Sequence, residues 1–162
     1  MMMEDMPGHL IRRLNQISTS VFQARMKHAG LDLTPVQFAA MTALADNPEI
    51  DQATLAGLIA YDRATIGGVV DRLLSKGLIL RRVNQKDRRA RVLDLTDAGR
   101  SLLARLSPIV EDLQPDILTG LSTEERATFV ALARKAAAAG NDLSRTPQRV
   151  PDTKKGASKE TP

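Results

Sequence analysis

The sequence predicts a mainly α-helical chain that carries one small β-hairpin. Three observations support this fold class. Apolar residues recur at helical spacing over most of the first 140 positions. Two short runs at residues 78–83 and 91–95 suit strands and flank a charged loop. Capping residues and glycines stand where the helical patterns begin and end.

Two helices are expected at the start of the chain. The first covers residues 9–29 and ends at Gly30. The second covers Pro35 to Ala45, because Thr34 suits the N-cap and proline suits the first helical position.

A helix, a tight turn and a second helix are expected next. Asp51 is the predicted N-cap of the first of these helices, and Asp62 that of the second, which Gly77 ends. The second helix has an apolar stripe of Ile66, Val69, Val70 and Leu73. Its other face is small or hydrogen-bonding: Ala64, Thr65, Gly68, Arg72 and Ser75. Such a face is typical of a recognition helix that approaches DNA.

The hairpin is expected to pair strands Leu78–Val83 and Arg91–Leu95. Its loop region contains one acid, Asp87, and six basic residues: Arg81, Arg82, Lys86, Arg88, Arg89 and Arg91. Because so many like charges repel one another, this pattern favours an anionic partner.

Two helices should follow the hairpin. Thr96 is the predicted cap of one that extends to about Leu118. Ser122 and Glu125 form a capping box that starts another at Thr123–Ala139. Beyond them, we expect residues 141–162 to form a disordered basic tail, either merely solvated or adding nonspecific DNA affinity.

Composition excludes several classes of function. The chain has no cysteine, which excludes disulfides and cysteine redox sensing, and its two histidines do not favour a metal site. No Ser-His-acid arrangement or phosphate-binding glycine loop is present, so we expect neither an enzyme nor a cofactor. The net charge of +4 is concentrated in the hairpin and tail, which points to a polyanion. No apolar run suits a membrane span, and we expect a cytoplasmic protein.

Three motifs carry a resemblance to a known family. They are Gly77-Leu78-Ile79, Asp87-Arg88-Arg89 and Leu95-Thr96-Asp97-Ala98-Gly99. Their order and spacing resemble the winged helix-turn-helix of the MarR (multiple antibiotic resistance regulator) family, over about residues 8–140. The resemblance implies a DNA-binding transcriptional regulator in which the hairpin is the wing.

The resulting domain division has four parts. Residues 34–98 form the winged helix-turn-helix, and residues 8–33 and 99–140 form dimerisation helices. Terminal helices outside a winged domain would bury their apolar stripes against a partner's, so we expect a homodimer. The tail at 141–162 is the fourth part.

The expected DNA contacts come from the turn, the recognition helix and the wing. They are Arg63, Thr65, Gly68, Arg72, Arg88, Arg89 and Arg91. The wing arginines suit a narrow minor groove, and Asp87 is expected to orient one of them. Gly67 and Gly68 depart from the family pattern, and either close helix packing or close backbone approach to DNA would account for them.

An effector site is the remaining expectation. His9 and Arg13 are four residues apart and share one helix face, close to where the family places its ligand pocket. Arginine can hold a carboxylate by two hydrogen bonds. The segment Gly8–Arg13 resembles the corresponding segment of family members that respond to aromatic acids. This resemblance implies that the ligand is a hydroxybenzoate or a hydroxynicotinate. Phe38, Met41 and Thr42 would line the pocket, although a phenylalanine such as Phe38 is more often part of the core. The alternative is that His9 and Arg13 are both surface groups, or that Arg13 makes an interhelical salt bridge.

The sequence therefore predicts a homodimeric repressor that binds a pseudo-palindromic operator and is released by a small aromatic carboxylate. A ligand-independent repressor or an activator of the same fold is the first alternative. A winged-helix module for protein–protein contact is the second, which the basic wing does not favour.

Overall fold

The computed structural model describes residues 2–85 and 87–149, and the chain in it is mainly helical with one β-hairpin. In chain order the elements are the 3-10 helix η1 (Met3–Asp5), α1 (Pro7–His28), α2 (Pro35–Asp46), α3 (Gln52–Leu58), α4 (Ile66–Ser75), β1 (Ile79–Val83), β2 (Arg91–Leu95), α5 (Asp97–Ile117), α6 (Thr123–Ala139) and the 3-10 helix η2 (Asn141–Leu143). This architecture confirms the predicted fold class.

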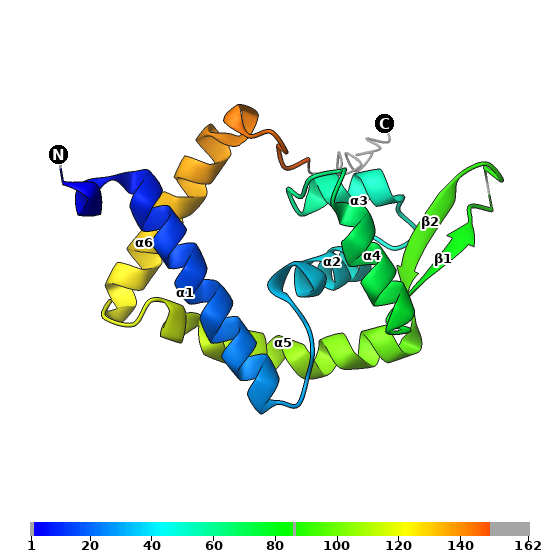
Figure 1. The fold of residues 1–162 in the computed structure, drawn as a ribbon, viewed down its shortest axis with the longest axis horizontal. Helices are drawn as coiled ribbons and strands as arrows, with labels where there is room; N and C mark the ends of the chain where they lie inside the picture. The colour runs from blue at the N-terminus through cyan, green and yellow to red at the C-terminus, as the bar shows by residue number, and fades with distance from the viewer. Residues whose placement is uncertain (1, 86, 150–162) are drawn as a thin grey trace, which may run out of the picture.

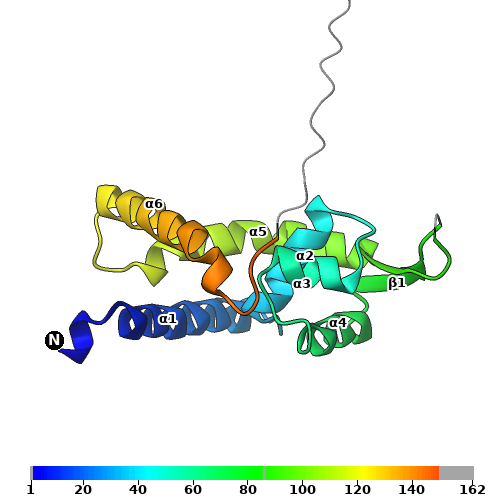
Figure 2. The ribbon, with the colours of Figure 1, turned by 90° about the horizontal axis from the view of Figure 1, so that it is seen from above.

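Helix α5 joins two groups of elements (Figure 1). Helices α2, α3 and α4 and the hairpin lie toward one end of α5, while α1 crosses it and α6 turns back from its other end. Seen from above, α1 and α6 run along opposite flanks of the molecule (Figure 2). Helix α6 thus leaves α5 at the end opposite to the hairpin.

The helix starts follow the predicted capping chemistry. Thr34 and Ser122 each form a full capping box, with Gln37 and Glu125 respectively. The Asp51 carboxylate accepts a hydrogen bond from the Thr54 amide at 2.8 Å, and the Thr96 hydroxyl accepts one from Gly99 at 3.0 Å. These caps satisfy amides that have no partner inside the helix.

Helix α4 begins later than expected. Thr65, not Asp62, occupies its N-cap position. Asp62 instead starts the preceding turn, where its carboxylate accepts from the Ala64 amide at 3.2 Å and its carbonyl accepts from the Ile66 amide at 2.9 Å. Asp62 therefore organises the entry to the helix, and Arg63 and Thr65 lie before the helix.

The core lies beneath the winged region and extends along α5. Met41, Leu55, Val70 and Leu73 are fully buried, together with Leu106 from α5. The predicted buried stripe of α4 is confirmed, since all four of its apolar residues are buried.

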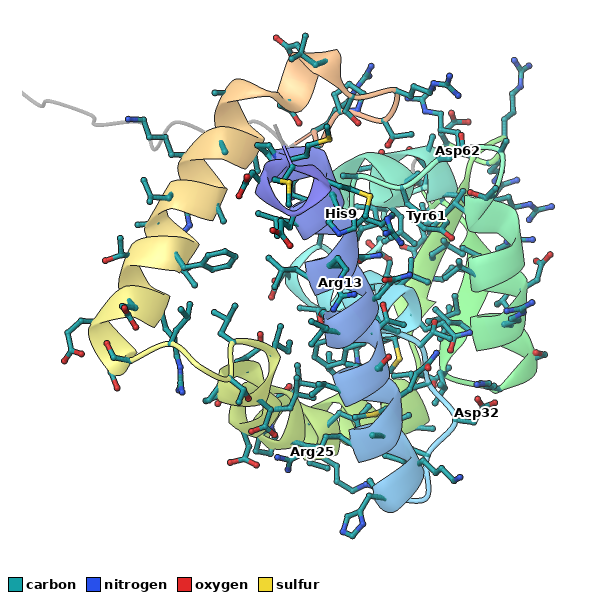
Figure 3. The ribbon with its side chains drawn as sticks, turned by 60° about the vertical axis from the view of Figure 1, so that its left-hand side comes forward. His9, Arg13, Arg25, Asp32, Tyr61 and Asp62 are labelled. Atoms are coloured by element: carbon teal, nitrogen blue, oxygen red, sulfur yellow. The ribbon has the colours of Figure 1, made fainter. Side chains whose placement is uncertain are left out.

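Helix α1 is tied to α5 by charge as well as by packing. Arg25, labelled in Figure 3, donates to Asp112 at 3.0 Å and to Asp116 at 2.5 Å. The hydrogen bond to Asp116 and the charge of that carboxylate raise the Arg25 pKa, with a smaller contribution from Asp112. This cluster adds an ion-paired contact between α1 and α5 to their packing.

The hairpin is antiparallel, with Ile79 opposite Leu95 and Val83 opposite Arg91. A third short segment joins it, because Leu93 donates its amide to the Ile50 carbonyl at 2.8 Å. The sheet is thereby anchored to the loop before α3.

The C-terminal segment differs from the expected disordered tail. Residues 141–149 form η2 and a loop that reaches α3, so the expectation does not describe them. Residues 150–162 lie outside the described part of the chain. No helix among the described residues is long and apolar enough to cross a membrane.

Candidate nucleic-acid interface

Two arginines of the hairpin are paired within the winged region. Arg82 lies 2.7 Å from the Glu49 carboxylate and 2.9 Å from that of Asp94, which is almost fully buried. Arg81 lies 3.9 Å from Asp71. The expectation of unopposed charge is therefore wrong for these two positions. They hold the base of the wing, and an external anion is needed only to explain the charge at its tip.

The wing tip is shaped by Asp87. Its carboxylate accepts a hydrogen bond from the Arg89 backbone amide at 2.9 Å, and its carbonyl accepts from the Ala90 amide at 3.0 Å. Within the described residues the carboxylate thus bonds to a backbone amide, where a guanidinium was expected. Arg88, Arg89 and Arg91 are exposed, so Asp87 orders the loop that presents them.

The turn before α4 and α4 itself present further cations. Arg63 is exposed in the turn before α4, and Arg72 is exposed on α4 itself. The Thr65 hydroxyl already donates to the Asp62 carbonyl at 3.2 Å, which leaves its lone pairs available as acceptors.

The two glycines of α4 differ in their surroundings. A side chain at Gly68 would meet no atom within 4 Å, and this residue is exposed. A Cβ at Gly67 would lie 3.7 Å from the Gln52 amide nitrogen, an ordinary contact. Since neither position is crowded, close packing inside the chain does not explain the glycines.

The junction between the hairpin and α5 contains the remaining motif residues. Gly77 adopts a positive φ of 67° that ends α4, and its carbonyl accepts from the Thr96 hydroxyl at 2.7 Å. A Cβ at Gly99 would lie 2.0 Å from the Leu78 carbonyl oxygen, so only glycine fits there. These residues hold the wing against α5 and do not form part of its exposed tip.

The residues expected at an effector site fall into two groups. His9 and Arg13 lie one turn apart on α1 (Figure 3), where His9 is half-buried and its ring nitrogen lies 3.4 Å from Arg12. Met41 is fully buried, Phe38 packs against Phe22 with ring centroids 6.1 Å apart, and Thr42 bonds back to its own helix. Met41 therefore has no surface for a ligand in this chain.

The described cavities lie elsewhere. One of about 520 Å³ lies where α1 meets the loop to α2, and one of about 530 Å³ lies between α6 and Ala60. A third, of about 160 Å³, is lined by Tyr61, Asp62 and Arg63 together with Arg145 and Arg149. These last two arginines were not expected at the site, because nothing in the local sequence shows that they lie beside the turn.

Comparisons with known proteins agree on one family. The MarR family pattern matches residues 33–90. The transcriptional regulator HosA of Escherichia coli O157:H7 is 37% identical over 127 residues, which cover 78% of this chain and 91% of HosA.

Two solved structures have the same fold. BpsR of Bordetella bronchiseptica, whose DNA binding is regulated by 6-hydroxynicotinic acid, is 31% identical with a TM-score of 0.77, and the match covers 85% of this chain and 96% of BpsR. The transcriptional repressor CouR, bound to a 23-mer DNA duplex, is 28% identical with a TM-score of 0.75, over 85% of this chain and 98% of CouR.

Proposed function

Because this chain belongs to the MarR family and is a transcriptional regulator and not an enzyme, we propose that it is a homodimeric repressor released from DNA by a small aromatic carboxylate. Its operator would be a pseudo-palindrome, since a two-fold symmetric dimer presents two identical reading surfaces. The half-sites would lie about one helical turn, roughly 10 bp, apart.

The observation that carries this proposal is the separation of paired from unpaired arginines. Arg82 is paired with Glu49 and the buried Asp94, and Arg81 donates to the Gln52 side chain beside Asp71, whereas Arg88, Arg89 and Arg91 are exposed and have no ion pair within the described residues. A structural role therefore explains the first two but not the other three. An ordered, cationic loop fits the phosphate-lined minor groove.

Helix α4 would enter the major groove. Arg72 suits a base edge or phosphate, and Arg63 and Thr65 suit the backbone beside the helix start. Gly68 would let the helix backbone approach DNA closely, because no side chain covers it. Few side chains remain for direct base contacts, so DNA shape and the wing would supply much of the specificity.

The dimer is supported by apolar side chains that this chain leaves exposed. Ile11 on α1 is 67% exposed and Leu132 on α6 is 61% exposed, and Leu10, Ile17 and Val130 are also exposed. A partner's α1 and α6 would cover them, because burial of apolar surface favours association. Sedimentation should find a dimer, and a compact monomer would contradict both the interface and the palindromic site.

The effector site is proposed at the dimer-facing side of α1. Arg13 would pair with the carboxylate and His9 would hydrogen-bond a ring substituent. Phe38 and Thr42 would border the pocket, and the buried Met41 would support it from beneath. The regulation of BpsR by 6-hydroxynicotinic acid supports this class of ligand.

Release from DNA would follow from a population shift. The ligand would bind the dimer better when the two α4 helices have the wrong spacing for the operator. A coupling free energy of about 1–3 kcal/mol would change DNA affinity by roughly 5–150-fold.

The DNA proposal is tested by binding to duplexes that the protein itself selects from a random pool. Affinity should fall steeply as salt rises, because phosphate contacts release counterions. Arg89→Ala should weaken binding more than Lys155→Ala. A flat salt dependence, or a larger effect of the lysine change, would contradict the proposed contacts.

The effector proposal is tested by titrating hydroxybenzoates and hydroxynicotinates against DNA-bound wild type and Arg13→Ala. The wild type should be released and the variant should remain bound, while both bind DNA equally without ligand. Release of both proteins would remove Arg13 from the site. If none of these acids releases the wild type, a ligand-independent repressor or an activator becomes the better description.

A further inference from the structure

The segment after α6, residues 141–149, which we term the C-terminal arm, crosses to the C-terminal end of α3 (Figures 1 and 2). Three hydrogen bonds fix it there: the Arg149 amide to the Gly57 carbonyl at 2.8 Å, the Gln148 side chain to the Leu58 carbonyl at 2.9 Å, and the Thr146 hydroxyl to the Ala60 carbonyl at 3.2 Å. Gly57 and Leu58 are the last two residues of α3 and Ala60 follows them, so these bonds attach the arm to the end of that helix.

The arm also closes on itself. The Gln148 amide donates to the Asn141 side chain at 2.8 Å, and the Asn141 side chain donates back to the Gln148 carbonyl at 3.2 Å. The absence of a side chain at Gly57 leaves room for Arg149, whose Cβ would lie only 3.3 Å from a Cβ at that position. The arm thus has a defined conformation and a defined place on α3.

This placement brings two arginines to the turn before α4. Arg145 and Arg149 line the same cavity of about 160 Å³ as Arg63 and Asp62. All three arginines are exposed, and within the described residues none of them is ion-paired with a carboxylate. The Asp62 carboxylate is already bonded to the Ala64 amide. The cluster is therefore cationic and open to an anion.

We propose that the C-terminal arm is part of the DNA interface and that Arg145 and Arg149 bind the sugar-phosphate backbone beside the contact made by Arg63. This inference rests on the proposed DNA-binding function. Arginine suits phosphate because its guanidinium donates two parallel hydrogen bonds. Such contacts fix the register of the protein on the duplex without reading bases.

A matched pair of double variants tests the position of these charges. Arg145→Ala/Arg149→Ala and Lys154→Ala/Lys155→Ala each remove two positive charges per chain. In a log–log plot of affinity against salt, each phosphate that the protein neutralises contributes about 0.9 to the slope. For a dimer, the arginine variant should therefore reduce the slope by roughly 3 to 4. The lysine variant should change it by much less, and hydroxyl-radical footprints should show weaker backbone protection only with the arginine variant.

Two results would overturn the inference while the wild type still binds DNA. An unchanged slope for the arginine variant would show that Arg145 and Arg149 do not contact phosphate. An equal reduction of the slope for the arginine and lysine variants would show that only the total charge of the chain matters, and not the position of these arginines. Hydrogen exchange of the Arg149 amide in the DNA-free protein tests the docking separately. It should be slowed, and exchange at the rate of an unstructured chain would refute the docked arm. Failure of the wild type to bind any duplex would instead refute the proposed function itself.

Discussion

Gly68→Ala should stabilise the protein and weaken its binding to DNA. A Cβ at this position meets no atom within 4 Å, and Gly68 is not among the glycines with positive φ. Alanine is therefore accommodated without strain, and it favours a helix by about 0.5–1 kcal/mol relative to glycine. For a chain of this size the melting temperature should rise by roughly 1–4 °C.

The weaker DNA binding follows from the same open space. If the α4 backbone lies against DNA, two new methyl groups per dimer would push both helices out of the groove. Disrupting the recognition of one base pair costs about 1–3 kcal/mol. Affinity should therefore fall roughly tenfold or more, since tenfold corresponds to about 1.4 kcal/mol.

Gly67→Ala is the matched control. It offers a similar gain in helix propensity, but its methyl group faces Gln52 at 3.7 Å, inside the winged region. Melting curves and fluorescence anisotropy on a selected duplex, both at equal protein concentration, measure the two effects. Wild-type affinity for Gly68→Ala would refute the close backbone approach. An equal decrease in affinity for Gly67→Ala would place the cause in the helix as a whole.

Three further outcomes are expected. Gly99→Ala should destabilise the protein by about 1–3 kcal/mol or more, because its Cβ would lie 2.0 Å from the Leu78 carbonyl; a melting temperature equal to wild type would contradict this. Asp94→Ala should also lower stability in urea, since it leaves Arg82 on β1 and Arg100 on α5 without the buried carboxylate that they share, at 2.9 Å and 3.2 Å. Leu132→Glu should shift the protein toward monomer in sedimentation, because a charge would replace apolar surface in the proposed interface; unchanged dimerisation would remove α6 from it.

Local sequence signals were sufficient to predict most of the fold. The caps at Thr34, Thr96 and Ser122 are contacts between residues three apart, so the sequence contains both partners. The start of α4 was misplaced because Asp62 and Thr65 are both good capping residues. Asp62 begins a turn that leads into the helix, and the sequence pattern does not distinguish these two arrangements.

Contacts between distant residues account for the parts of the site that were not predicted. The pairing of Arg82 with Glu49 joins residues 33 positions apart, so both appeared to be free charges in the sequence. The C-terminal arm is held on α3 largely through backbone carbonyls, which every residue possesses. No residue type therefore marks its docking site, and a segment rich in polar residues was expected to be disordered.

The junction of Gly77, Thr96 and Gly99 makes the wing a replaceable part. Its bonds lie between the hairpin base and α5, and none involves residues 87–89 at the tip. A different loop could therefore be grafted between β1 and β2 without disturbing the attachment. Because the Thr96 cap of α5 is bonded to the Gly77 carbonyl, a change in the orientation of α5 would also move the wing base. Gly77, Thr96 and Gly99 thus determine how the wing is attached to α5, and the sequence of the wing tip can vary independently of them.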